Sequence, residues 1–87
     1  MEHDKYKDVS DEQLIVRLRE GQPQVMDYLM EKYKNLVLKR ANALYLIGGE
    51  TQDLVQEGMI GLFKAVRDYR ADKEVSFYHF AELCINR

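Results

Sequence analysis

The chain has 87 residues, of which 46% are hydrophobic and 32% charged, and its formal net charge is −2. This composition is typical of one small globular domain and excludes an intrinsically disordered chain. The slight acidic excess argues against a protein whose whole surface is built for nucleic acid, because such proteins usually carry a clear basic excess.

Hydrophobic periodicity predicts helices throughout, and no segment alternates as a strand would. Residues 1–9 are expected to form a polar, poorly ordered tail. Ser10 can cap a short first helix, and Gln13, three residues on, completes a capping box. Gly21 is expected to end this helix. Its apolar face consists of Leu14, Ile15 and Leu18.

A long second helix is predicted from Pro23, which suits a first turn, to about Leu46. Gly48-Gly49 then breaks the chain. The side chains expected to face inward on this helix are Val25, Leu29, Leu36, Val37 and Leu44, with Tyr33 alongside. A basic stretch, residues 32–40, contrasts with an acidic one, residues 50–57, so the chain carries local patches of each sign that can serve two unlike partners.

The third predicted helix, about 51–70, carries three distinct strips at 100° per residue. The core strip is Val55, Met59, Leu62, Val66 and Tyr69. A strip with almost no side chain is Leu54, Gly58, Gly61 and Ala65. Glycines inside a helix cost roughly 1 kcal/mol each relative to alanine, so a neighbouring helix is expected to approach closely there. The roughly opposite strip is acidic and centred on Ile60, which indicates a docking surface for a basic partner: Asp53, Gln56, Glu57, Ile60 and Lys64.

A charged connection, residues 71–75, leads to Ser76 as the N-cap of a fourth helix that runs through Arg87. Three cations just before this helix (Arg67, Arg70 and Lys73) precede three aromatic residues in it (Phe77, Tyr78 and Phe80). Cations can hold phosphates while rings stack on unpaired bases, at about 1–3 kcal/mol per base. A core role is the alternative for the rings, since Phe77, Phe80 and Cys84 form a stripe that can face inward. Nearby acids also match the cations one for one.

The expected fold is therefore all-α, a compact bundle of three main helices and a short N-terminal helix. The last segment, FYHFAELCINR, is a helix without a stop signal, so we expect a fragment of a longer chain. The single cysteine fits a reducing compartment. No apolar run or signal segment suggests contact with a membrane, and we expect a cytoplasmic protein.

Enzymatic and cofactor chemistry finds little support in the sequence. His3 and His79 lack metal-ligand spacing to Cys84 or to each other. Gly58 and Gly61 lie within a helical pattern and not in a phosphate-binding loop after a strand. A small metal-free hydrolase would need a nucleophile with a neighbouring base, and no such pair can be named. We expect no enzyme, no cofactor and no metal site.

The segments DLVQEGMIGLFKAVRDYR and SFYHFAELCINR resemble the second conserved region of bacterial RNA polymerase sigma factors. The first matches the family signature D-L-x-Q-E-G-x-I-G-L-x-x-A-V-x-x-[FY] at every fixed position. The resemblance extends more weakly over residues 10–47, and DYLMEKYKNLV and FAELCIN are most similar to the sigma-H type of stationary phase and sporulation. Residues 10–87 are thereby expected to be a region 2-like domain without the family's C-terminal helix-turn-helix.

The resemblance implies two binding roles in transcription initiation. In the family, the helix with D-L-x-Q-E-G docks on the clamp coiled coil of the largest subunit of core RNA polymerase. This implies polymerase contacts at Asp53, Leu54, Gln56, Glu57, Ile60 and Lys64. The following segment captures flipped bases of the single-stranded promoter −10 element. This implies DNA contacts at Lys73, Phe77, Tyr78, His79, Phe80 and Arg87.

One departure from the family concerns duplex opening. Primary sigma factors carry a tryptophan pair where this chain has Leu83-Cys84, which implies a weaker wedge into the duplex. An anti-sigma protein that covers the acidic face is a further candidate partner. The alternative function is a helical protein–protein adaptor with no role on DNA, in which the aromatic cluster is entirely core.

Overall fold

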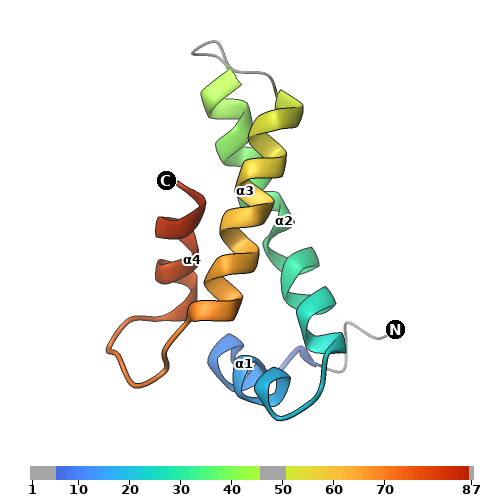
Figure 1. Ribbon diagram of the computed structural model, residues 1–87, viewed down its shortest axis with the longest axis vertical. Coiled ribbons are helices and arrows are strands. Elements are labelled where there is room, and N and C mark those ends of the chain that lie inside the picture. Colours follow the sequence, from blue (N-terminus) through green and yellow to red (C-terminus); the bar gives the residue numbers. More distant parts are fainter. Residues whose placement is uncertain (1–5, 46–50, 87) are drawn as a thin grey trace.

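The computed structural model describes residues 6–45 and 51–86, which form four helices. Their bounds are α1 Asp11–Arg19, α2 Gln24–Tyr45, α3 Thr51–Asp68 and α4 Phe77–Ile85. The long helices α2 and α3 run antiparallel, α4 lies beside α3, and α1 lies across the end of the bundle where α3 ends (Figure 1). This arrangement confirms the predicted all-α bundle. The predicted break at Gly48-Gly49 lies outside the described residues.

The helix ends follow the local signals in the sequence. The hydroxyl oxygens of Ser10 and Ser76 each accept a hydrogen bond from the backbone N–H three residues later, both at 3.2 Å. These bonds satisfy amide donors that a helix leaves unpaired at its N-terminus. Gly21 follows α1 with a φ of 105°, a conformation that glycine adopts without strain. The predicted caps and the predicted stop are therefore confirmed.

The expectation of a poorly ordered tail is wrong for residues 6–9. Tyr6 is only 6% exposed, and its ring centroid lies 4.9 Å from that of Tyr28 on α2. Val9 also packs against the core, and its N–H donates to the carbonyl of Tyr6 at 3.1 Å. The many charges around Tyr6 suggested a solvated segment, but burial of one aromatic ring is enough to dock it.

The core lies where the four helices meet. Its largest fully buried side chains are Leu14, Ile15, Val25, Leu29, Val37, Leu62, Val66 and Phe77. On α2 the buried stripe continues through Ala41, whereas Leu36 and Leu44, which were expected to face inward, are only partly buried. The stripe steps by four residues along α2, and these two leucines lie beside it.

The two glycines of α3 allow close contact with two different helices. A Cβ atom built on Gly58 would lie 2.6 Å from Cγ1 of Val37 on α2. A Cβ on Gly61 would lie 2.6 Å from the backbone carbonyl oxygen of Cys84 on α4. The predicted close approach is confirmed, and it places α3 against α2 and α4 at once.

Substitution of Gly61 by alanine is expected to lower the free energy of unfolding by about 1–3 kcal/mol, despite the better helix propensity of alanine. The added methyl group would meet backbone, which cannot rotate away, so α3 and α4 must separate. Urea denaturation measures the change. Gly58→Ala is the comparison variant: its methyl group would meet Cγ1 of Val37, a buried β-branched side chain that is stiff at χ1, so a loss of similar size is expected. A Gly61→Ala protein as stable as the wild type would contradict the close contact.

Tyr33 links α2 to α1 and to α4. Its side chain is 5% exposed, its hydroxyl donates to the Asp11 carboxylate, and its ring packs edge-on against Phe77 at 5.3 Å between centroids. Asp11 also pairs with Lys32 at 2.7 Å. Burial, and then the hydrogen bond to Asp11, raises the pKa of Tyr33 above its ordinary value of 10.0.

The free energy of unfolding is expected to fall as the pH rises above about 10, because the unfolded chain then loses the Tyr33 proton that the folded state retains. Tyr33→Phe should make this alkaline decline shallower, and at neutral pH it should cost about 1 kcal/mol for the lost hydrogen bond. Equal pH profiles for Tyr33→Phe and wild type would contradict the assignment.

Candidate functional site

The predicted docking strip of α3 faces solvent. Asp53, Gln56, Glu57 and Lys64 are exposed, and Ile60, at the centre of the strip, is 56% exposed. Leu54 is half-buried and turns toward α2, where it shares a cavity of about 230 Å³ with Val37, Leu44 and other residues. The predicted outward placement is confirmed, and the role of these residues remains a prediction.

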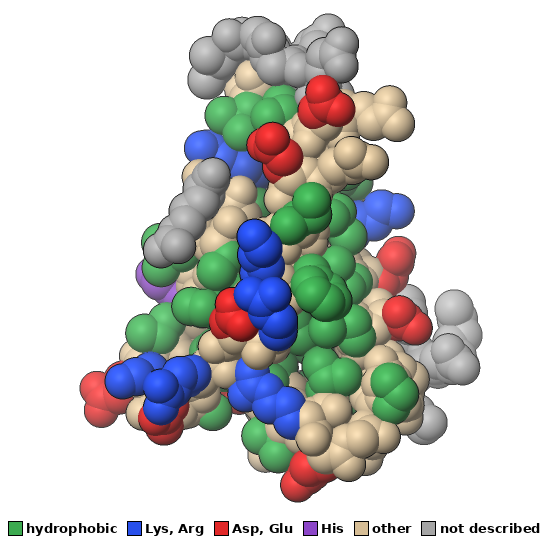
Figure 2. All heavy atoms as spheres, viewed as in Figure 1, with side chains coloured by type: hydrophobic (Ala, Val, Ile, Leu, Met, Phe, Trp, Pro, Cys, Tyr) green, Lys and Arg blue, Asp and Glu red, His purple; other side chains and the backbone are tan. Residues whose placement is uncertain are grey.

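Helix electrostatics account for part of the charge distribution on α3. Asp53 lies in the first turn and Arg67 in the last, where each charge interacts favourably with the helix dipole and so stabilises the helix. Glu57 lies beyond the first turn, so the dipole does not explain its presence. Figure 2 shows acidic side chains over the N-terminal part of α3, basic side chains over its C-terminal part, and hydrophobic side chains between and beside them.

A groove of about 450 Å³ runs between α3 and α4 beside the docking strip. It is lined by Glu57, Ile60, Gly61, Lys64, Asp68, Phe80, Leu83 and Cys84. Leu83 is 56% exposed and brings an apolar side chain of α4 next to Ile60. In the sequence, Leu83 stood out only as one of the two residues that replace the tryptophan pair of primary sigma factors. Its outward position follows from the i, i+4 stripe of Phe77, Ala81 and Ile85, which leaves Leu83 outside.

The prediction that Phe77 contacts DNA is wrong. Phe77 is 0% exposed and lies between the rings of Tyr33 and Tyr69, at 5.3 and 5.5 Å between centroids. It is the first residue of α4 and shares the inward stripe with Ala81 and Ile85. The core alternative considered for the aromatic cluster therefore holds for this residue.

The other predicted DNA contacts do not form a single cluster. Tyr78 is 50% exposed, but its ring lies 6.0 Å from that of Tyr33, on the side of α4 that faces α2. His79 is exposed. Arg87 lies outside the described residues. Phe80 and Lys73 remain, and they lie together on the side of α4 that faces the end of α3.

Phe80 and Lys73 line a cavity of about 250 Å³ at the turn between α3 and α4. Asp68, Tyr69, Arg70 and Val75 complete its wall. The Phe80 ring is half-buried and lies 5.9 Å from the ring of Tyr69 between centroids. The hydroxyl of Tyr69 donates to the carbonyl of Val75 at 2.7 Å and so closes the turn. Tyr69 and Val75 were missed as candidates, because helical periodicity assigns Tyr69 to the core and assigns nothing to a connection.

The cations around this cavity differ in their pairing. Arg70 contacts the Asp72 carboxylate at 2.9 Å, and this hydrogen bond lowers the pKa of Asp72. Arg67 makes two hydrogen bonds to Asp68, at 2.7 and 2.8 Å, which lower the pKa of Asp68. Lys73, by contrast, makes no ion pair with any residue that the structure describes. The predicted one-for-one neutralisation holds for the two arginines, and Lys73 is the cation best able to meet an external phosphate.

Residues 6–45 and 51–86 offer neither a metal-binding cluster nor a membrane-spanning helix. In that part of the chain, no group of three or more His, Cys, Asp or Glu side chains could hold a metal ion. None of the helices described there is both long and apolar enough to cross a membrane.

Known proteins resemble this chain over most of its length. Residues 29–87 match the family model described as sigma-70 region 2. The RNA polymerase sigma-H factor of Bacillus licheniformis is 48% identical over 84 residues, and that of Bacillus subtilis (strain 168) is 46% identical over 84 residues. Each alignment covers 97% of this chain but 38% of the relative, so the chain spans less than half the length of these proteins. No solved structure matches it significantly. The helix with the outward acidic strip lies inside the matched segment, and the chain belongs to the sigma-70 region 2 family.

Proposed function

We propose that this chain is the region of a sigma-H-like factor that binds core polymerase and contacts the single-stranded promoter −10 element, in a specificity subunit without catalysis of its own. The observation that carries the proposal is the solvent exposure of the α3 docking strip, with Ile60 at 56%. An isoleucine at the centre of an acidic helical surface adds little to the stability of an isolated domain. It gains free energy when a partner covers it.

The partner of the docking strip is core RNA polymerase, through the clamp coiled coil of its largest subunit. Asp53 and Glu57 supply negative charge for a basic surface, and Ile60 supplies the apolar centre. Desolvated apolar anchors surrounded by polar groups carry most of the binding free energy in protein interfaces. An anti-sigma protein would compete for the same strip. Because RNA polymerase works in the cytoplasm, we propose that location for the chain.

The second partner is the single-stranded −10 element, of which one flipped base occupies the cavity lined by Phe80. Tyr69, Val75 and Phe80 form most of the apolar wall of this cavity. Arg70 and Lys73 also line it and supply positive charge for the phosphates. Stacking on the ring would offset the cost of unpairing, which is a few kcal/mol per flipped base. Leu83-Cys84 offers no large ring to wedge the duplex, so we propose that the chain stabilises an open strand more than it opens one.

Reversing the charge of the docking strip should abolish retention of the chain on core polymerase. We expect Gln56→Lys combined with Glu57→Lys to weaken binding by at least about 2 kcal/mol, roughly 30-fold, because like charges would face a basic partner. A pull-down of core RNA polymerase with the tagged chain measures retention. Folding should be unchanged, since both side chains are exposed.

The matched control for this double change is Glu20→Lys with Gln22→Lys. It makes the same change in net charge at two exposed positions in the connection after α1. This control should be retained like the wild type. Retention of the Gln56→Lys, Glu57→Lys protein would show that the docking strip is assigned to the wrong face.

Loss of the Phe80 ring should weaken binding to a single-stranded DNA oligonucleotide of the −10 element by about 1–3 kcal/mol. Phe80→Leu keeps most of the apolar volume in the half-buried position, so circular dichroism should show an intact fold. Fluorescence anisotropy measures the affinity. Tyr78→Ala removes an exposed ring on the side of α4 that faces α2, and it should change the affinity little.

Equal losses for Phe80→Leu and Tyr78→Ala would move the DNA contact away from the cavity. Unchanged affinity in both would favour the adaptor function, in which the aromatic residues serve the core alone.

A further inference from the structure

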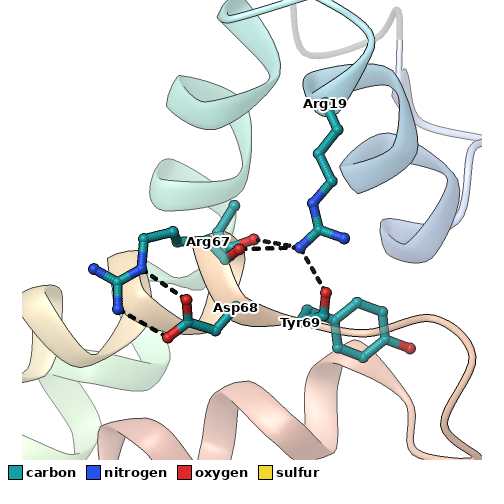
Figure 3. A network of polar contacts seen from close by, with 5 residues as sticks. Arg19, Arg67, Asp68 and Tyr69 are labelled. Carbon is teal, nitrogen blue, oxygen red and sulfur yellow. Dashed lines mark hydrogen bonds and ion pairs between the residues drawn. The ribbon is translucent and has the colours of Figure 1, made fainter.

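Two charged side chains of α1 bind the backbone at the ends of α3 and α4. The Nη2 atom of Arg19 donates to the carbonyl oxygens of Val66, Arg67 and Tyr69, at 3.4, 3.1 and 2.5 Å (Figure 3). The last carbonyls of a helix have no partner within it and carry the negative end of its dipole. A guanidinium placed there neutralises this end and fixes where the helix stops.

Glu12, two turns earlier on α1, makes the complementary contact with α4. Its Oε2 atom accepts a hydrogen bond from the backbone N–H of Phe77 at 2.7 Å. Phe77 is the first residue of α4, so this N–H is one of the donors that the helix leaves unpaired. A carboxylate at this end also meets the positive end of the helix dipole.

Arg19 and Glu12 thereby hold both ends of the turn that forms the Phe80 cavity. The turn leaves α3 at Tyr69 and enters α4 at Phe77, and the side chains of Tyr69, Arg70, Lys73 and Val75 that line the cavity lie on it or at its start. Within the turn, the described hydrogen bonds are few: Lys73 N–H donates to the carbonyl of Arg70 at 3.2 Å, Tyr69 binds Val75, and Arg70 binds Asp72. The backbone of the cavity therefore depends on contacts from α1 that are 50 and 65 residues away in sequence.

We infer that Arg19 and Glu12 are positioning residues for DNA capture, an inference that rests on the proposed binding of a flipped base in this cavity. They touch neither the base nor the phosphates. They keep Tyr69 and Phe77 in place so that the cavity is formed before the strand arrives. A cavity that is formed only part of the time binds with an affinity reduced to that fraction of its full value.

The test separates positioning from a general loss of charge. Arg19→Gln removes the guanidinium from the end of α3. Arg17→Gln makes the same change in charge on the same helix, at a side chain that takes no part in these contacts. We expect Arg19→Gln to weaken binding of the −10 oligonucleotide roughly 10-fold, as when the competent state falls to about one tenth of the population. Arg17→Gln should bind normally, and Arg19→Lys should recover part of the loss.

Retention on core polymerase is the readout that general damage to the fold would move. The docking strip begins at Asp53, at the other end of α3, so Arg19→Gln should be retained like the wild type. Loss of polymerase and DNA binding together would overturn the inference, because Arg19 would then serve the whole fold. An equal loss of DNA affinity in Arg17→Gln would overturn it as well, because charge alone would explain the effect.

A double-mutant cycle with Phe80→Leu distinguishes this inference from the proposed function. If Arg19 acts through the cavity, Arg19→Gln should cost much less in the Phe80→Leu protein than in the wild type. Fully additive losses would show that Arg19 acts elsewhere and would overturn the inference. Normal binding by Phe80→Leu would overturn the proposed function itself. Weak binding by Phe80→Leu with normal binding by Arg19→Gln would overturn the positioning role alone.

Discussion

The rest of the structure depends on one constraint: α3 contacts two helices through a strip that carries almost no side chain. At Gly58 the helix meets Val37 of α2, and at Gly61 it meets the backbone of α4. The core strip through Leu62 and Val66 completes the packing, and the docking strip lies on the side of α3 that remains exposed to solvent.

Local physics made the helices predictable. Caps at Ser10 and Ser76, the stop at Gly21 and the strips of α3 depend on spacing of a few residues, and the structure agrees with each. The aromatic cluster was harder, since successive residues of a helix point 100° apart and only the tertiary contacts decide which direction is inward. Phe77 is therefore core, Phe80 lines a cavity, and Tyr78 faces α2.

The long-range polar contacts could not be predicted from the sequence. Nothing in the pattern around Arg19 indicates that it binds the end of a helix more than 40 residues later, because a charged residue in a last turn is already accounted for by its own helix dipole. The docking of Tyr6 was missed for a similar reason, since its charged neighbours resemble a solvated tail. In both cases the partner comes from an element whose position is known only after the bundle is assembled.

The continuity of α3 has a consequence for the proposed function as a whole. Ile60 lies on α3, and Tyr69 directly follows the last residue of this helix. The two are about 14 Å apart along the helix axis at 1.5 Å per residue. Under the proposed function, binding of the docking strip to the polymerase would fix both the distance and the direction from the enzyme to the cavity that receives the flipped base. The position at which the DNA strands separate would then be fixed by the number of residues between the docking strip and the cavity, because no flexible segment lies between them.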